Sequence, residues 1–153
     1  MVYLFALLIG AIAGLRTMTA PTAVAWAAHL GCINLAGTWL GFMGSVWAVG
    51  IFSVLALGEL VADQLPSTPS RKVPMQFGAR LVSGALSGAA IGLAGGLAPL
   101  LAAICGIAGA VIGTLGGAAL RGRLAAAFGK DLPAALIEDA VAIGGALLIV
   151  TNL

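Results

Sequence analysis

Apolar residues follow one another along this chain in five runs, most of them near the length of about 20 residues that a helix needs to cross a membrane. Short connections separate the runs, and three prolines interrupt the second connection. The pattern predicts an all-α fold, a polytopic membrane helical bundle of about five transmembrane segments, in a single domain over residues 1–153. The runs cover residues 2–30, 39–65, 80–97, 100–120 and 132–150, and the connections cover residues 31–38, 66–74, 95–99 and 121–131.

Composition excludes an ordinary soluble protein. Hydrophobic residues make up 61% of the chain and charged residues 8%, whereas charged residues are about 25% of a soluble domain. We therefore expect the lipid bilayer as the main partner. Nucleic-acid binding is excluded as well, because no soluble surface remains to carry a basic binding face.

The basic residues predict how the bundle is oriented. Outside the first run they fall into two short segments, which five alternating helices bring to one side of the membrane. Short connections rich in Lys and Arg stay in the cytoplasm, so we expect the N-terminus inside and the C-terminus outside. No basic residue precedes residue 2, so a cleaved signal peptide is not expected. The basic segments contain Arg71, Lys72 and Arg80, and Arg121, Arg123 and Lys130.

The first run contains polar residues in its middle. Arg16, Thr17, Thr19 and Pro21 combine a charge, two residues that cap helices and a proline that starts them. We expect this segment to be broken or kinked there. A helix restarting near Thr19 would direct its positive N-terminal end into the membrane, next to the guanidinium group.

Several further charged residues fall inside the predicted membrane segments. An ionised side chain at the centre of a membrane helix costs about 2.5–3.5 kcal/mol, so such residues are usually paired or face a polar cavity. Glu59 and Asp63 share a helix face, whereas Glu138 and Asp139 point about 100° apart. The predicted substrate-binding or gating residues are Arg16, Thr17, Thr19, Glu59, Asp63, Arg80, Arg121, Glu138 and Asp139.

Two runs carry glycine at every fourth position, a spacing that lets helices approach closely. These faces pack either within the bundle or in a homo-oligomer, with a dimer favoured. The motif Gly-Ala-x-x-Gly also occurs twice, which is compatible with an inverted repeat. The glycines are Gly84, Gly88, Gly92 and Gly96, and Gly109, Gly113 and Gly117; the motifs begin at Gly10 and at Gly109.

Two cysteines, Cys32 and Cys105, lack the spacing of a metal site. We expect small buried apolar side chains at both positions. Their depths in the predicted topology are also compatible with a disulfide.

Four stretches resemble a bacterial membrane-protein family known as domain of unknown function 4126. The family often has Asn where this chain has Arg16, and some members carry a His and a Lys that this chain lacks. The resemblance implies a bacterial cytoplasmic (inner) membrane location and implies no established activity. The stretches are Gly14 to Pro21, Glu59 to Arg71, Ala79 to Ala85 and Glu138 to Gly145.

Three functions remain open from the sequence. The first is a transporter, flippase or channel component for an anionic small molecule or lipid phosphate, which Arg16 and the positive helix end would bind. The second is an enzyme acting on lipid phosphates, with a divalent cation held by Glu59, Asp63 and Glu138; no other cofactor is expected. The third is a non-catalytic membrane assembly subunit.

Overall fold

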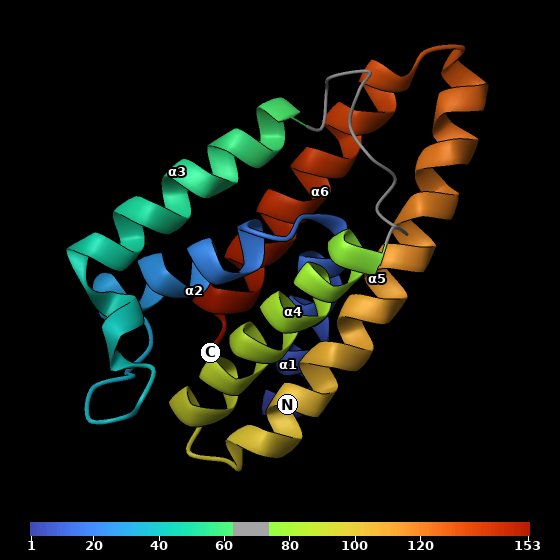
Figure 1. The fold of residues 1–153 in the computed structure, drawn as a ribbon. Helices are drawn as coiled ribbons and strands as arrows, with labels where there is room; N and C mark the ends of the chain where they lie inside the picture. The colour runs from blue at the N-terminus through green and yellow to red at the C-terminus, as the bar shows by residue number, and fades with distance from the viewer. Residues whose placement is uncertain (63–73) are drawn as a thin grey trace.

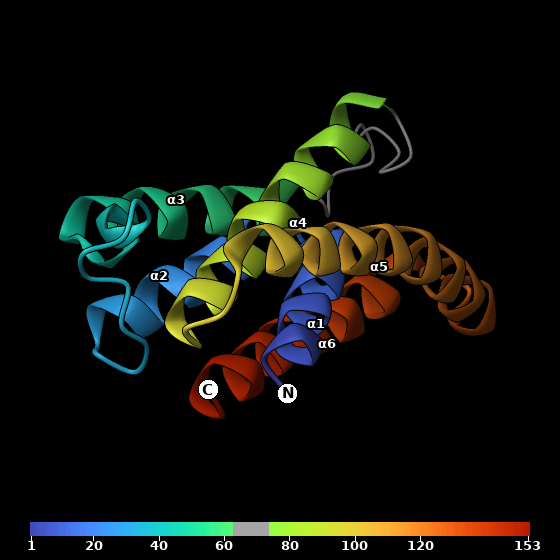
Figure 2. The ribbon, with the colours of Figure 1, turned by 90° about the horizontal axis from the view of Figure 1, so that it is seen from below.

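The computed structural model describes residues 1–62 and 74–153, and the regular structure in these ranges is entirely helical (Figure 1). The all-α fold is therefore confirmed for the described residues. Helices α1, α4 and α5 pack closely together, α6 lies against α5, and α2 and α3 lie side by side (Figures 1 and 2). The helices are α1 Val2–Leu15, α2 Thr19–His29, the short 3-10 helix η1 Gly41–Gly44, α3 Val46–Ala62, α4 Pro74–Ala94, α5 Pro99–Phe128 and α6 Asp131–Thr151.

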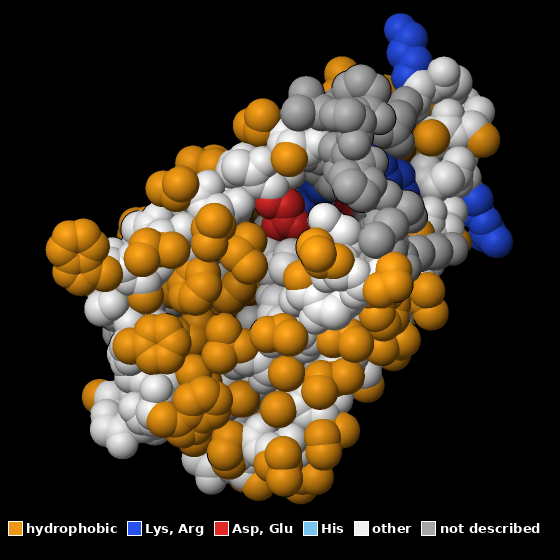
Figure 3. Space-filling model, viewed as in Figure 1, with side chains coloured by type: hydrophobic (Ala, Val, Ile, Leu, Met, Phe, Trp, Pro, Cys, Tyr) orange, Lys and Arg blue, Asp and Glu red, His pale blue; other side chains and the backbone are white. Residues whose placement is uncertain are grey.

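Within the part of the chain that the structure describes, three helices are long and apolar enough to cross a membrane: α4, α5 and the stretch Leu132–Thr151 of α6. Helices α1 and α3 are apolar but shorter, at 14 and 17 residues. Hydrophobic side chains cover much of the face in Figure 3, and basic side chains protrude near the connection of α5 and α6. Exposed apolar surface of this extent indicates a membrane protein in a lipid bilayer.

Two predicted segments have different boundaries in the structure. The run 39–65 becomes an α-helix only at Val46, because turns and η1 occupy the preceding residues. The connection predicted at 121–131 is wrong for most of its length, since α5 continues to Phe128. Arg, Leu and Ala are strong helix formers, and the helix ends only where Gly129 adopts a left-handed conformation with φ 69°.

Both chain ends lie at the same end of the bundle, whereas the sequence predicts an N-terminus inside and a C-terminus outside. Met1, Cys32, Gly95 and Leu153 line one cavity, and the two ends are close together in Figures 1 and 2. The reason is that α2 does not continue in the direction of α1 but returns toward the end from which α1 starts. The later helices alternate, so α6 ends beside the N-terminus.

The glycine faces pack against one another within the chain. A Cβ atom added at Gly84 would lie 2.6 Å from the carbonyl oxygen of Gly106, and one at Gly88 would lie 2.5 Å from that of Ala102. Gly109 and Gly113 are as close to the backbone of α1. These contacts place α4 and α1 beside each other on neighbouring faces of α5, where both approach Gly106.

The expected inverted repeat is wrong in its direction. Gly10 lies against Gly106, and Gly14 lies against Ala110, so residue numbers rise together along α1 and α5. The two Gly-Ala-x-x-Gly motifs are therefore on parallel helices, whereas an inverted repeat would make these helices antiparallel. Gly96 also differs from its prediction, because it has φ 69° in the turn before α5 and a Cβ atom added there would meet nothing within 4 Å.

Both cysteines are free thiols. Cys32 follows α2 and is exposed, so the prediction of burial is wrong for this residue. Cys105 lies on α5 and is partly buried.

Candidate functional site

The candidate site is the interruption between α1 and α2. Arg16 has an extended backbone, with φ −140° and ψ 114°, and its N–H still donates to the carbonyl oxygen of Ile12 at 2.8 Å. Helix α2 begins three residues later, at Thr19. An interruption of this kind leaves the last carbonyls of one helix and the first N–H groups of the next without partners inside either helix. Inside a membrane, side chains have to satisfy them.

The Arg16 side chain is fully buried and forms an ion pair across the bundle. Its Nη2 donates to Oδ1 of Asp139, which lies 123 positions away on α6. The exposed fraction is 0% for Arg16 and 9% for Asp139. Desolvating either charge alone would be costly, so their pairing makes this arrangement tolerable.

Glu59 caps the start of α2 from the neighbouring helix α3. Its Oε1 accepts the N–H of Thr17, and its Oε2 accepts the N–H of Met18, both at 2.7 Å. A carboxylate is favoured here because the N-terminal end of a helix carries partial positive charge. The same N–H groups are the kind that bind carboxylate and phosphate groups of ligands.

Arg80, on α4, satisfies the end of α1. Its Nη1 donates to the carbonyl oxygen of Gly14 at 2.5 Å, and the Thr114 hydroxyl donates to the same oxygen at 3.3 Å. Arg80 is 3% exposed, and its positive charge is favourable at the C-terminal end of a helix. The Ser83 hydroxyl donates to the carbonyl oxygen of Thr17. Side chains from α4 and α5 thus bind the carbonyls on both sides of Arg16.

Glu138 and Arg121 form a second pair, separate from the interruption. Oε2 of Glu138 lies 3.6 Å from Nη1 of Arg121, while the adjacent Asp139 contacts Arg16. Neighbouring positions on a helix point about 100° apart, so the two acids on α6 cannot both reach the guanidinium of Arg16. Glu138 is 7% exposed.

The structure brings five of the nine predicted site residues together at the interruption. Thr19 begins α2 beside them, and Arg121 and Glu138 form their own pair. Asp63 lies outside the described residues. The sequence did not lead us to Ser83 and Thr114. Each is a hydroxyl-bearing residue in a largely apolar helix, and this pattern could have indicated them. The five residues are Arg16, Thr17, Glu59, Arg80 and Asp139.

The described residues do not assemble the predicted cation site. Within residues 1–62 and 74–153, no three His, Cys, Asp or Glu side chains lie close enough together to hold a metal ion. Glu59 binds the start of α2, and Glu138 faces Arg121. The guanidinium of Arg16 and the backbone N–H groups of Thr17 and Met18 are groups that can bind negative charge.

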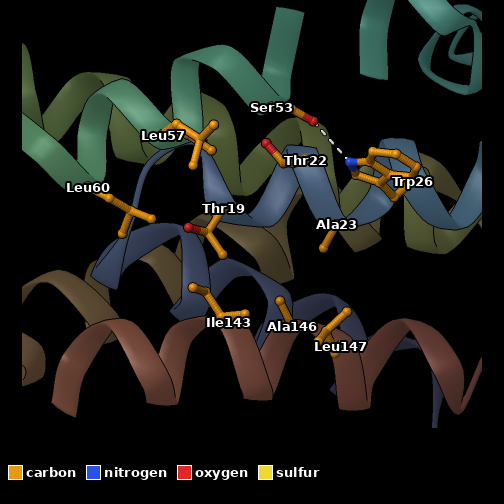
Figure 4. Close-up of a pocket in the computed structure, with 11 residues that line it drawn as sticks. Thr19, Thr22, Ala23, Trp26, Ser53, Leu57, Leu60, Ile143, Ala146 and Leu147 are labelled. Atoms are coloured by element: carbon orange, nitrogen blue, oxygen red, sulfur yellow. Dashed lines mark hydrogen bonds between the residues drawn. The ribbon is translucent and has the colours of Figure 1, made fainter. Parts of the chain in front are cut away.

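An apolar cavity of about 320 Å³ lies beside the interruption, between α2, α3 and α6 (Figure 4). Thr19, at the start of α2, and Leu60, next to Glu59, belong to its lining. Toward its other side the Nε1 of Trp26 donates to the Ser53 hydroxyl at 2.9 Å. We call this cavity the α2–α3–α6 groove. Its lining is Thr19, Thr22, Ala23, Trp26, Ser53, Ala56, Leu57, Leu60, Ile143, Ala146 and Leu147.

No family model matches the chain, and no curated protein or solved structure matches it either. A function therefore has to be inferred from the geometry of the interruption.

Proposed function

We propose that this protein is a transporter, flippase or channel component that moves an anionic group, carried by a small molecule or a lipid phosphate, across the membrane. The observation that carries the proposal is the interrupted helix, where Arg16 and the N–H groups of Thr17 and Met18 are held by two carboxylates of the chain. Interrupted helices in transporters direct such N-terminal ends at anionic substrates. Glu59 and Asp139 thus occupy positions that an anionic substrate group would take.

Glu59 is the carboxylate that a substrate displaces. It is partly exposed, whereas Asp139 is buried, and it lies on α3, which packs chiefly against α2. Among the residues of α3, only Ala48 and Val49 are buried. A shift of this lightly packed helix withdraws Glu59 and leaves two backbone N–H groups for a carboxylate or phosphate. Arg80, Ser83 and Thr114 hold the carbonyls of the interruption meanwhile.

We also propose a bacterial inner-membrane location with the α5–α6 connection in the cytoplasm. Arg121, Arg123 and Lys130 lie at that end, and short basic connections stay inside. Since both termini lie at the other end of the bundle, they face outward. Single cysteines introduced at residues 2 and 153, with Cys32 and Cys105 replaced by Ala, should react with an impermeant maleimide added to intact cells. A cysteine at position 123 should be protected, and the opposite pattern would refute this orientation.

Membership of the family known as domain of unknown function 4126 is a further proposal. The sequence motifs around Arg16, Glu59 and Glu138 support it. It predicts that a solved structure of a family member has the same interruption in its first helix, and a continuous helix there would contradict it.

Movement of two probes across proteoliposomes tests the transport proposal. We expect the protein to accelerate the movement of fluorescently labelled phosphatidylglycerol, measured by dithionite bleaching, or of labelled inorganic phosphate. Arg16→Gln should slow that movement by more than about tenfold, which corresponds to about 1.4 kcal/mol in the barrier. Arg123→Gln, at an exposed position on the same protein, should leave the rate unchanged.

Two results would contradict the proposal. One is wild-type protein that moves neither probe faster than protein-free vesicles do. The other is an unchanged rate in the double variant Arg16→Gln, Asp139→Asn, which neutralises both partners of the buried ion pair and so avoids leaving a lone charge behind.

A further inference from the structure

We infer that the substrate of the interruption is a membrane amphiphile, with its anionic headgroup at the start of α2 and one hydrocarbon chain in the α2–α3–α6 groove. The inference rests on the proposed function and specifies its substrate class. It favours a lipid phosphate over a free anion in solution.

The groove suits hydrocarbon because most of its lining is apolar and its polar side chains Thr22, Ser53 and Trp26 are already hydrogen-bonded. The Thr22 hydroxyl lies within donating distance of two carbonyl oxygens, that of Met18 at 2.6 Å and that of Phe52 at 2.9 Å, and the Ser53 hydroxyl accepts from Trp26. The rest of the lining is almost wholly aliphatic, with Leu57, Leu60, Ile143 and Leu147 around the cavity in Figure 4. Water entering such a site would find few partners.

The groove is continuous with the charged site. Thr19 lines it and lies one residue after Met18, whose N–H is held by Glu59; Leu60 adjoins Glu59 in sequence. From Thr19 to Trp26 the groove follows about 10 Å of helix α2. A single amphiphile can therefore place a phosphate against the N–H groups and extend its chain along α2.

A lipid chain fits the groove better than a helix from a second copy. Helices in membranes approach closely where small residues alone line the contact, whereas this lining mixes small residues with large, exposed side chains. Leu57 is 63% exposed, Leu147 54% and Trp26 44%. The partial positive charge at the start of α2, at one end of the groove, complements an anionic headgroup. An apolar helix from a second copy has no group that would bind there.

Trp26 provides a fluorescent reporter inside the groove. Replacing Trp39 and Trp47, which are 65% and 82% exposed, by Phe leaves Trp26 as the single tryptophan of the chain. The protein is reconstituted in phosphatidylcholine vesicles that contain a minor share of lipid with brominated chains, which quench nearby tryptophan. Brominated phosphatidylglycerol is compared with brominated phosphatidylcholine at equal mole fraction.

We expect stronger quenching by the anionic lipid, because its headgroup is bound at the interruption. Ala56→Phe fills the groove and should abolish this preference. Val54→Phe is the matched control, since it places the same side chain on α3 at a position that is 68% exposed and outside the lining. It should retain the preference.

Equal quenching by the two lipids, or a preference that survives Ala56→Phe, would overturn the inference. Quenching that falls as the protein-to-lipid ratio rises would mean that a second copy fills the groove, and would also overturn it. The same experiments distinguish a failure of this inference from a failure of the proposed function. If Arg16→Gln stops phosphate movement while both lipids quench equally, transport of a free anion stands and the amphiphile does not.

Discussion

Replacement of Arg16 by Met is expected to lower the free energy of unfolding by about 3–5 kcal/mol, the usual cost of removing one partner from a buried ion pair. The variant leaves Asp139, which is 9% exposed, without the guanidinium that it contacts. A methionine of similar length keeps most of the packing around position 16, so the loss reports mainly the stranded charge. Thermal and chemical unfolding in a fixed detergent measure it.

Two further variants test whether the loss of stability comes from the stranded charge of Asp139. Adding Asp139→Leu to Arg16→Met removes the stranded charge, so the double variant should recover most of the lost stability. Arg123→Met changes an exposed arginine and should alter stability by less than about 0.5 kcal/mol. Similar stabilities of Arg16→Met and Arg123→Met would mean that Arg16 is not held in a buried pair.

Glu59→Ala is expected to lower the free energy of unfolding by about 2 kcal/mol, the upper end of the loss measured for helix caps. The variant removes the acceptor of two N–H groups at the start of α2. Glu59→Gln keeps one carbonyl oxygen, so it should lose less. If Ala and Gln at position 59 leave the unfolding transition where it is in the wild type, then Glu59 does not cap α2.

The sequence was sufficient to locate the residues of the interruption but not the direction of the chain through it. Residues 16–18 leave the same backbone groups without helical partners whether the chain kinks or reverses. The reversal of α2 depends on partners such as Glu59 and Ser83, which lie far away in sequence. The sequence prediction therefore separated two chain ends that lie close together in the structure, although the apolar runs located most of the helices.

The glycine spacing and the intramembrane charges likewise indicated which residues make contacts, but not which helices they contact. The repeats on α4 and α5 indicated faces for close packing, but a spacing of four does not identify the partner helix. That partner is α5 for Gly84 and α1 for Gly109. Likewise, the 100° offset between Glu138 and Asp139 indicated that the two carboxylates point in different directions. Only the fold shows that Asp139 contacts Arg16 and that Glu138 faces Arg121.

If the start of α2 is an anion site that Glu59 fills, a free anion should restore the stability that Glu59→Ala loses. The melting temperature of this variant in detergent is followed during titration with acetate or inorganic phosphate, with chloride at the same ionic strength as reference. We predict a saturable rise with acetate or phosphate that is larger than in the wild type, because the free anion takes the place of the missing carboxylate on the N–H groups of Thr17 and Met18, where Glu59 competes with it in the wild type. Equal responses to acetate, phosphate and chloride, or the same rise in the wild type, would contradict the claim.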